Sequence, residues 1–295
     1  MRNGVISFAI AWFSLQLAPA NDFRKSYTIP ADSQIFIENF LGNIKLTSYK
    51  GKTVELIAYK KGLDGDLIEI KEDRGPNRIT IYSRDPRFAP PKPSFGFGAP
   101  KPFASRNPFP PPGPPAPPAG VSKASVDFEI RVPQSIEYKQ ISLSSFLGSG
   151  KVEVSEVKGN FSILTGTGPV EVSEIKGHFS IQTRSGSVEI KNVTGQVAAS
   201  STSGTINVYL AHTNEPREMN FSSVSGNVIV QAPSSFNATI DMWSQSSGLL
   251  KTNFDIKIQD DRYGLGKSVR GVQLGKGKDK LRIYSNFGQV SLMHK

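Results

Sequence analysis

The amino-acid sequence predicts an all-β protein, a parallel β-solenoid (β-helix) with two short strands in each coil of about 18–22 residues. A Ser/Thr-Gly-x-Val/Ile motif returns every 18 residues from Ser149 onward. A further glycine lies between successive copies, which places glycines at 150, 159, 168, 177, 186, 195 and 204. Short runs of alternating apolar and polar residues separate them. Such a period is typical of a solenoid, because each unit buries its apolar face only by stacking on the next.

The alternation within each unit predicts which side chains fill the core. Successive side chains of a strand point to opposite faces, so the apolar residues of one unit point inward together. One sheet then contributes two columns, Val152, Val170, Val188 and Ile206, and Val154, Val172, Ile190 and Val208. The facing sheet contributes Phe161, Phe179 and Val197, with Ile163, Ile181 and Ala199. Because burying each such side chain stabilises by about 1.5–3 kcal/mol, these columns are the expected main source of stability.

The glycines are expected at the corners between strands. A tight corner often needs a positive φ, which costs a residue with a Cβ roughly 1–2 kcal/mol, so we expect positive φ angles at these glycines. The hydroxyl residues just before the motif glycines are expected to stack and to satisfy the amides of the corners. These residues are Ser149, Thr167, Ser185 and Ser203.

Later coils are longer than 18 residues. The spacing is 22 residues from Gly204 to Gly226 and again to Gly248, and 40 residues from there to Gly288. We expect the extra residues to leave the coil as loops at one corner. The largest of these expected loops runs from Asp260 to Lys280.

Four regions follow each other along the chain. Residues 1–20 are an expected signal peptide, with Arg2, an apolar stretch over Val5–Leu17, and the cleavage pattern Ala18-Pro19-Ala20. Residues 21–86 contain short alternating strands, the first coils or cap of the solenoid. Residues 87–123 are a proline-rich exposed insertion, and residues 124–295 are the solenoid repeat domain. No later segment reaches the roughly 20 apolar residues of a membrane span, so we expect an exported protein, periplasmic or at the cell surface.

The proline-rich insertion differs from the rest in composition. Fourteen of the 21 prolines lie between Pro86 and Pro118. Proline removes backbone donors, so this segment is not expected to pair as a strand. It is expected to be an exposed polyproline-II or disordered arm, either a tolerated surface insertion or a ligand for an aromatic groove.

Composition limits the possible chemistry. The chain has no cysteine, which excludes disulfides, thiolate metal sites and thiol nucleophiles. Its formal charge of +10 suits anionic glycans or other envelope surface components as partners, although it is also ordinary for a soluble basic protein. We expect no nucleic acid partner, cofactor, metal or catalytic residue.

The repeats resemble a bacterial family of exported β-strand-repeat proteins labelled candidate adhesins and otherwise of unknown function. The resemblance includes the early Leu41-Gly42-Asn43-Ile44 element, a strand ending at Val132-Pro133, the successive Ser-Gly-x-Val coils and a last coil at Phe287-Gly288-Gln289-Val290. It implies a surface or envelope location and adhesion. It implies no catalytic residues.

Two groups of charged residues are candidate binding sites. The outward partners of the core columns, Glu153, Glu171 and Glu189, form a possible acidic ladder about 4.8 Å apart that could attract a cation. Nearby Lys158 and Lys176 can offset this charge, which favours a solvated mixed-charge face. The second group surrounds the longest expected loop and could hold an anionic ligand, namely Arg262, Tyr263, Lys267, Arg270, Lys276, Lys278, Lys280 and Arg282.

The sequence therefore favours an exported non-catalytic adhesin or envelope scaffold. One alternative is a polysaccharide-binding or polysaccharide-degrading β-helix protein, for which Asp241, Asp260 and Asp261 are the available carboxylates. Another alternative is a sensor of envelope stress. The oligomeric state stays open.

Overall fold

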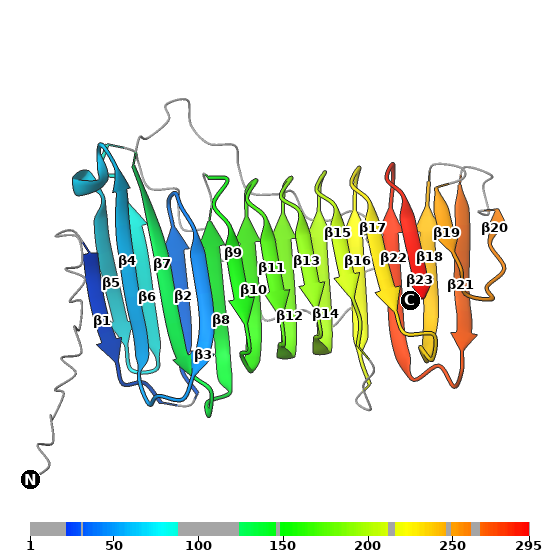
Figure 1. Cartoon of the computed structure of the whole chain (residues 1–295), viewed down its shortest axis with the longest axis horizontal. Coiled ribbons are helices and arrows are strands. Elements are labelled where there is room, and N and C mark those ends of the chain that lie inside the picture. Colours follow the sequence, from blue (N-terminus) through cyan, green and yellow to red (C-terminus); the bar gives the residue numbers. More distant parts are fainter. Residues whose placement is uncertain are drawn as a thin grey trace, which may run out of the picture.

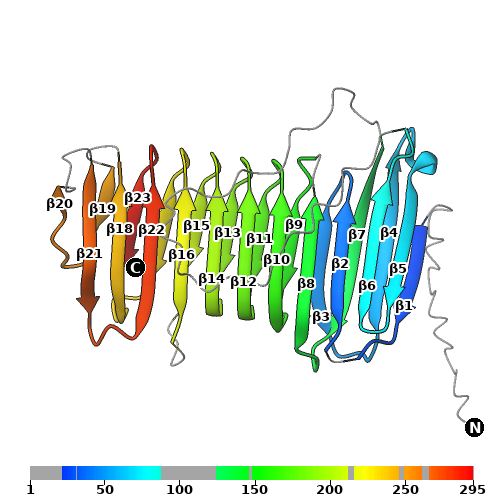
Figure 2. The same ribbon diagram turned by 180° about the vertical axis from the view of Figure 1, so that it is seen from behind.

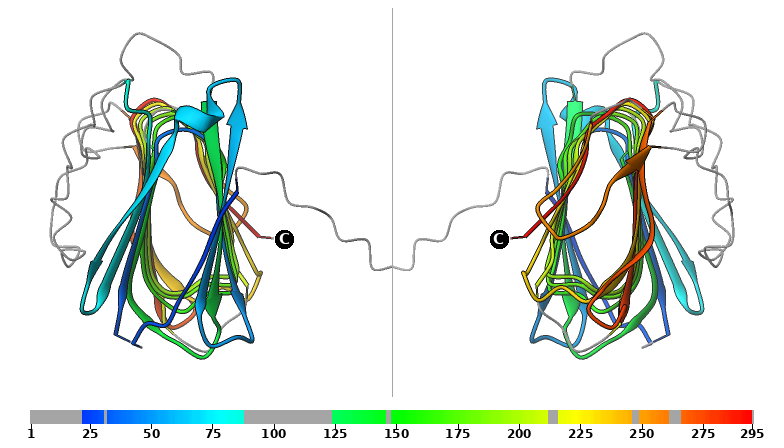
Figure 3. Two further views of the ribbon diagram at one scale, coloured as in Figure 1. Left: turned by 90° about the vertical axis from the view of Figure 1, so that its left-hand side faces the viewer. Right: turned by 90° about the vertical axis from the view of Figure 1, so that its right-hand side faces the viewer.

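The protein is an all-β solenoid of two long sheets that face each other, seen from the side in Figures 1 and 2 and along its axis in Figure 3. The computed structural model describes residues 22–30, 32–87, 124–145, 148–211, 216–245, 249–260 and 266–294. The expected signal peptide and residues 88–123 of the proline-rich insertion lie outside this range. The predicted fold class is confirmed.

Sheet A contains eleven strands. In spatial order they are β1 (Asp22–Tyr27), β4 (Val54–Gly62), β7 (Ala124–Pro133), β3 (Ile44–Tyr49), β9 (Val152–Ser155), β11 (Val170–Ser173), β13 (Val188–Lys191), β15 (Ile206–Tyr209), β17 (Val228–Ala232), β23 (Val290–His294) and β19 (Leu250–Thr252).

Sheet B contains twelve strands. In spatial order they are β20 (Gln259–Asp260), β21 (Lys267–Leu274), β18 (Ala238–Ser244), β22 (Asp279–Ser285), β16 (Glu218–Ser223), β14 (Thr194–Ser201), β12 (Lys176–Thr183), β10 (Gly159–Thr165), β8 (Tyr138–Ser145), β2 (Gln34–Asn39), β6 (Arg78–Arg84) and β5 (Glu69–Gly75). A short 3-10 turn, η1 (Gly65–Leu67), follows β4.

The repeating core follows the predicted columns. Val170 lies in register with Val152 on one side and with Val188 on the other, in parallel strands. In sheet B, Phe161 is in register with Phe179, and their rings are 6.3 Å apart. All these side chains are buried, so the inward assignment is confirmed. The N-terminal strands join the same core, since Ile44 of β3 pairs in register with Val152.

The corner glycines serve two different purposes. At the Ser/Thr-Gly corner, φ is not positive for Gly186, but a Cβ added there would lie 2.0 Å from the carbonyl oxygen of Gly168 in the previous coil. The expectation of positive φ is therefore wrong at this corner, where close stacking of backbones requires glycine instead. At the opposite corner it is right, since Gly177 has a φ of 138° and also approaches the Gly159 carbonyl.

A buried polar column holds the Ser/Thr-Gly corners. The predicted hydroxyls, such as Thr167, donate instead to carbonyls of the previous coil. At four corners, those of Gly186, Gly204, Gly226 and Gly288, the glycine amide donates to the hydroxyl three residues earlier. The Gly186 amide donates to Thr183 Oγ1 at 3.1 Å, and the Gly204 amide to Ser201 Oγ at 2.7 Å. The buried column runs across sheet B in register through Ser83, Asn39, Ser145, Thr165, Thr183, Ser201, Ser223, Ser285 and Ser244.

The last coils do not stack in sequence order. β22 pairs with β16, and β23 pairs with β17, so Gly288 stacks directly on Gly226. The earlier segments β18 and β19 lie outside this coil, on β22 and β23. Within the expected loop from Asp260 to Lys280, β21 pairs antiparallel with β18 and extends sheet B. The loop prediction is wrong there, because the segment completes the sheet instead of leaving it.

A buried ion pair stabilises this exchanged order. Asp279 begins β22, and Arg217 precedes β16, on the neighbouring strand. The Arg217 guanidinium donates to Asp279 Oδ2 at 2.7 and 2.9 Å, and the Arg217 amide donates to Oδ1 at 3.0 Å. Only 3% and 5% of the two side chains are exposed. Both charges are therefore satisfied only when β22 lies next to β16.

The C-terminal end of the core is closed by the chain itself. After β19 the chain crosses from sheet A to sheet B, and Ile256 is buried on the way. Phe254 packs against Phe236 and against His294, with ring centroids 6.4 and 5.4 Å apart. These side chains shield the last coil, whose apolar face has no further coil to cover it.

Substituting Gly186→Ala should destabilise the protein by about 1–3 kcal/mol or more, because the new methyl group overlaps the backbone of the previous coil. The matched control is Gly271→Ala. Gly271 has a φ of 60°, but no atom lies within 4 Å of the position that a methyl group would take, so only backbone strain of roughly 1 kcal/mol is expected. Chemical denaturation measures both, and an equal loss of stability would contradict the steric role of Gly186.

Substituting Asp279→Asn should destabilise the protein by about 3–5 kcal/mol, because it leaves the Arg217 charge buried without its counter-charge. The control is Glu189→Gln, which breaks an exposed pair with Lys191 and should change the melting temperature little. Thermal unfolding followed by circular dichroism compares them. Similar melting temperatures for the two variants would show that the buried pair does not hold the exchanged coil.

Candidate binding surfaces

The predicted acidic ladder exists as a row on the outer face of sheet A. Glu171 lies in register with Glu153 on one side and with Glu189 on the other. The strands are parallel neighbours, so the carboxylates repeat at the inter-strand spacing of about 4.8 Å. At its N-terminal side the row continues through Lys45 to Glu129.

Lysines compensate this row, although different ones from those expected. Lys151 Nζ lies 3.3 Å from Glu153 and 2.6 Å from Glu171, and Lys45 Nζ lies 3.6 Å from Glu153. Lys191 pairs with Glu189. The expected partners, Lys158 and Lys176, lie at the start of the sheet B strands, where a parallel backbone bridge joins them, because the corner after each glutamate strand carries them there.

The electrostatics of the row agree with a structural role. Hydrogen bonding to Glu171 raises the pKa of Lys151, and hydrogen bonding to Glu189 raises the pKa of Lys191. Both lysines therefore stay charged beside the glutamates at neutral pH. In the part of the chain that the structure describes, no three His, Cys, Asp or Glu side chains form a group that could hold a metal ion.

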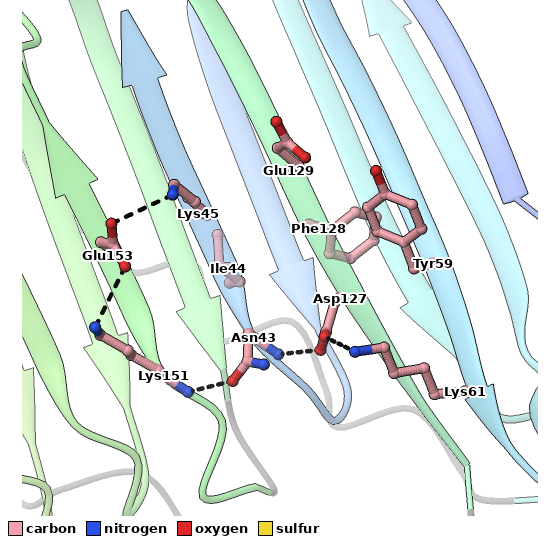
Figure 4. Close-up of a pocket in the computed structure, with 10 residues that line it drawn as sticks. All are labelled: Asn43, Ile44, Lys45, Tyr59, Lys61, Asp127, Phe128, Glu129, Lys151 and Glu153. Carbon is pink, nitrogen blue, oxygen red and sulfur yellow. Dashed lines mark hydrogen bonds and ion pairs between the residues drawn. The ribbon is translucent and has the colours of Figure 1, made fainter. Parts of the chain in front are cut away.

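A shallow depression of about 530 Å³ opens at the N-terminal end of this row, between β4, β7, β3 and β9 (Figure 4). Asp127 pairs with Lys61, and its Oδ1 accepts the Asn43 amide at 2.9 Å. Asn43 Oδ1 in turn accepts the Lys151 amide at 2.8 Å. These contacts link four neighbouring strands, β4, β7, β3 and β9, through side chains near the starts of β3 and β9.

The depression offers little for chemistry. Its lysines, Lys45, Lys61 and Lys151, each pair with a carboxylate. An anionic ligand would have to displace a carboxylate from each lysine before it could bind there. We therefore assign this face a role in holding the strands in register.

The predicted basic residues are divided by the fold. Arg262 and Tyr263 lie outside the described residues. Lys267 begins β21 and pairs with Asp260 of β20 at 2.5 Å. Lys276 and Lys278 lie in the turn between β21 and β22, where Gly275 and Gly277 have φ angles of 62° and 66°.

The remaining three basic residues lie at one end of the outer face of sheet B. Lys280 and Arg282 point outward from β22, because Leu281 and Ile283 between them are buried. Arg270 of β21 lies close enough to influence Tyr284 on the same face. Arg282 stands between two carboxylates, with Glu218 at 3.7 Å and Asp241 at 3.8 Å. At this end of the sheet, three basic side chains therefore stand beside two acidic ones. The basic residues are Arg270, Lys280 and Arg282, and the acidic ones are Glu218 and Asp241.

Two aromatic residues on this face were not identified from the sequence. Trp243 of β18 and Tyr284 of β22 lie in register, and both side chains are half-buried at outward positions. Burial raises the pKa of Tyr284, Asp241 raises it further, and Arg282 and Arg270 lower it. The available signal was the alternation of apolar and polar residues, since both aromatic residues occupy the outward position that Ser222, Ser200 and Gln182 occupy in β16, β14 and β12.

The comparison with family sequence models supports the fold. The sequence model of the family described as Toastrack DUF4097 matches residues 120–290. A comparison with curated proteins found no match. Among the described residues, no helix has the length and apolar character that a membrane crossing requires.

Two crystal structures are similar over most of the chain. One is a candidate cell adhesion protein from Clostridium sporogenes, 13% identical, covering 93% of this chain and 100% of its own, with a TM-score of 0.36. The other is a candidate adhesin from Bacteroides fragilis, 12% identical, covering 94% of this chain and 98% of its own, with a TM-score of 0.39.

Substituting Lys151→Gln should lower the melting temperature slightly, because it leaves Glu153 and Glu171 side by side without the shared cation. The loss should shrink when salt is raised from about 0.05 M to about 0.5 M, since salt screens exposed charges. Scanning calorimetry at both concentrations measures the effect. Lys139→Gln, at an exposed position of β8, is the control; an equal, salt-independent loss in both variants would contradict the charge-compensation role.

Proposed function

We propose that this chain, which belongs to the Toastrack DUF4097 family, is an exported adhesin-type module that binds an anionic envelope glycan without catalysing a reaction on it. The supporting observation is the basic end of the outer face of sheet B. Arg270 lies there on β21, and Lys280 and Arg282 lie on β22, with β18 between these two strands and the continuous core beneath them. An excess of fixed positive charge attracts anionic polymers.

Features of the sequence support the location. The apolar stretch of residues 1–20 with its cleavage pattern favours export. The absence of cysteine means that folding outside the cytoplasm does not depend on disulfides. The formal charge of +10 suits a surface rich in acidic polymers.

The carboxylates of this face favour binding over catalysis. Both Glu218 and Asp241 flank Arg282, which balances their charge. Asp241 also accepts the Gly271 amide at 2.8 Å, a contact that fixes it in the sheet. Asp260 forms an ion pair with Lys267 on β21. These carboxylates therefore serve to position neighbouring groups.

The proposal is tested by passing the purified protein over immobilised acidic and neutral glycans and measuring both retention and the release of new reducing ends. We expect retention on acidic glycans that weakens at high salt, because screening reduces charge attraction, and no new reducing ends. Arg270→Gln with Arg282→Gln should abolish retention. Lys71→Gln, which removes an exposed lysine from β5 at the other end of the sheet, should not. Release of reducing ends would favour a polysaccharide-degrading enzyme instead.

A further inference from the structure

Trp243 and Tyr284 lie in register on neighbouring strands at the C-terminal end of the outer face of sheet B. Their strands, β18 and β22, are parallel neighbours, seen side by side in Figure 2. Because the two residues are in register, their side chains project about 4.8 Å apart from the same side of the sheet. The inward neighbours Met242 and Ile283 are buried, which confirms that the rings face outward.

Small uncharged side chains border this aromatic pair. On β16 the residue in register with Tyr284 is Ser222, and Ser200 of β14 continues the row. On the other side Trp243 faces Ser268 of β21. The Tyr284 side of the pair therefore borders a row of small side chains, over which an extended ligand could lie.

A row of hydrogen-bonding side chains lies next to the aromatic pair, two residues earlier on the same strands. Asp241 precedes Trp243 and Arg282 precedes Tyr284, so they form the adjacent row, with Asn220 beside Arg282. The Arg282 contacts to Glu218 and Asp241, at 3.7 and 3.8 Å, are too long for hydrogen bonds. Its N–H groups are therefore available to a carboxylate of a ligand, and the two flanking carboxylates can accept hydroxyl groups.

An irregularity of the sheet shapes this row. The pairing of β18 with β21 shifts register between Ile240 and Met242, and Gly271 has a φ of 60° at this bulge. The Gly271 amide holds Asp241 Oδ1, which leaves Oδ2 near Arg282. Bulges of this kind commonly redirect side chains beside binding sites, and this one also carries Arg270.

We propose that Trp243 and Tyr284 stack on the sugar rings of an acidic glycan whose carboxylate binds Arg282, with Asp241 accepting its hydroxyls; this assignment rests on the proposed function and names the residues that recognise the sugar. A pyranose ring presents C–H groups on one face and hydroxyls around its edge. The large, rigid apolar surface of an aromatic side chain packs against the C–H face, and the charged side chains of the adjacent row can hydrogen-bond to the hydroxyls.

The carboxylates favour a glycan over a nucleic acid. Aromatic and arginine side chains also bind single-stranded nucleic acids. However, Asp241 and Glu218 would lie beside the phosphates of such a ligand, and phosphates carry no donor for them. Sugar hydroxyls supply that donor, and a uronic acid supplies the anion for Arg282.

The chain contains a direct reporter of this site. Its two tryptophans are Trp12, within the expected signal peptide, and Trp243. Once residues 1–20 are removed, tryptophan fluorescence arises from Trp243 alone. Titration with a galacturonate hexasaccharide should therefore change the fluorescence intensity and saturate, and calorimetry under the same conditions should give the same dissociation constant.

Variants separate the aromatic contribution from the ionic one. Trp243→Ala and Tyr284→Ala should each weaken binding of the hexasaccharide about tenfold in calorimetry, and Trp243→Phe should restore part of it because a ring is kept. The matched control is Tyr209→Ala, which removes a half-buried outward aromatic ring from β15 of sheet A and should leave binding within about twofold. Circular dichroism verifies that each variant is folded.

The outcomes distinguish this inference from the proposed function. If Trp243→Ala binds like the unaltered protein while Arg282→Gln does not bind, the aromatic assignment is overturned and ionic glycan binding stands. If the unaltered protein binds neither the hexasaccharide nor the acidic glycans of the retention experiment, the proposed function fails and this inference with it.

Equal competition by single-stranded DNA would overturn the choice of a glycan. Loss of affinity for the carboxyl-reduced hexasaccharide supports the role of Arg282, and unchanged affinity overturns it.

Discussion

The close stacking of one coil on the next is the constraint on which the rest of the structure depends. Parallel strands lie about 4.8 Å apart, and the corners that join them must keep the same spacing. At the Ser/Thr-Gly corners this leaves no room for a Cβ, since the carbonyl of the previous glycine occupies that space. The buried hydroxyl three residues earlier then satisfies the corner amide, as Thr183 does for Gly186. Glycine and hydroxyl together allow a buried turn whose glycine amide is hydrogen-bonded, which an apolar residue at position 183 would not.

The ends of the solenoid require different solutions, because a terminal coil has no neighbour on one side. At the C-terminal end the chain reverses the order of its coils and covers the last one with Phe254 and Ile256. The terminal strands are also poor templates for further pairing. β20 has two residues, β19 has three, and β5 at the opposite end is exposed and rich in charge. Short or charged edges disfavour edge-to-edge association.

The two outer faces differ in a way that matters for function. On sheet A, lysines beside the row of glutamates pair with them, and this mutual compensation leaves little net charge to attract a ligand. On sheet B, the exchanged coils bring residues from β18, β21 and β22 together, and these combine excess positive charge with two adjacent rings. The binding surface that we propose is thus a consequence of the coil order, since β22 would not lie beside β18 and β16 if the coils stacked in sequence.

Local pattern in the sequence determined the fold class, the inward columns and the alignment of Glu153, Glu171 and Glu189. It could do so because alternation and an 18-residue period report directly on which faces are buried and which residues share a position in successive coils. The tertiary structure alone decided the reason for glycine at Gly186, the lysine partners of the acidic row, and the order of the last coils. Each of these depends on contacts between segments distant in the chain, such as Arg217 with Asp279. The same holds for the aromatic pair, because Trp243 and Tyr284 are adjacent only through strand pairing, which no local periodicity encodes.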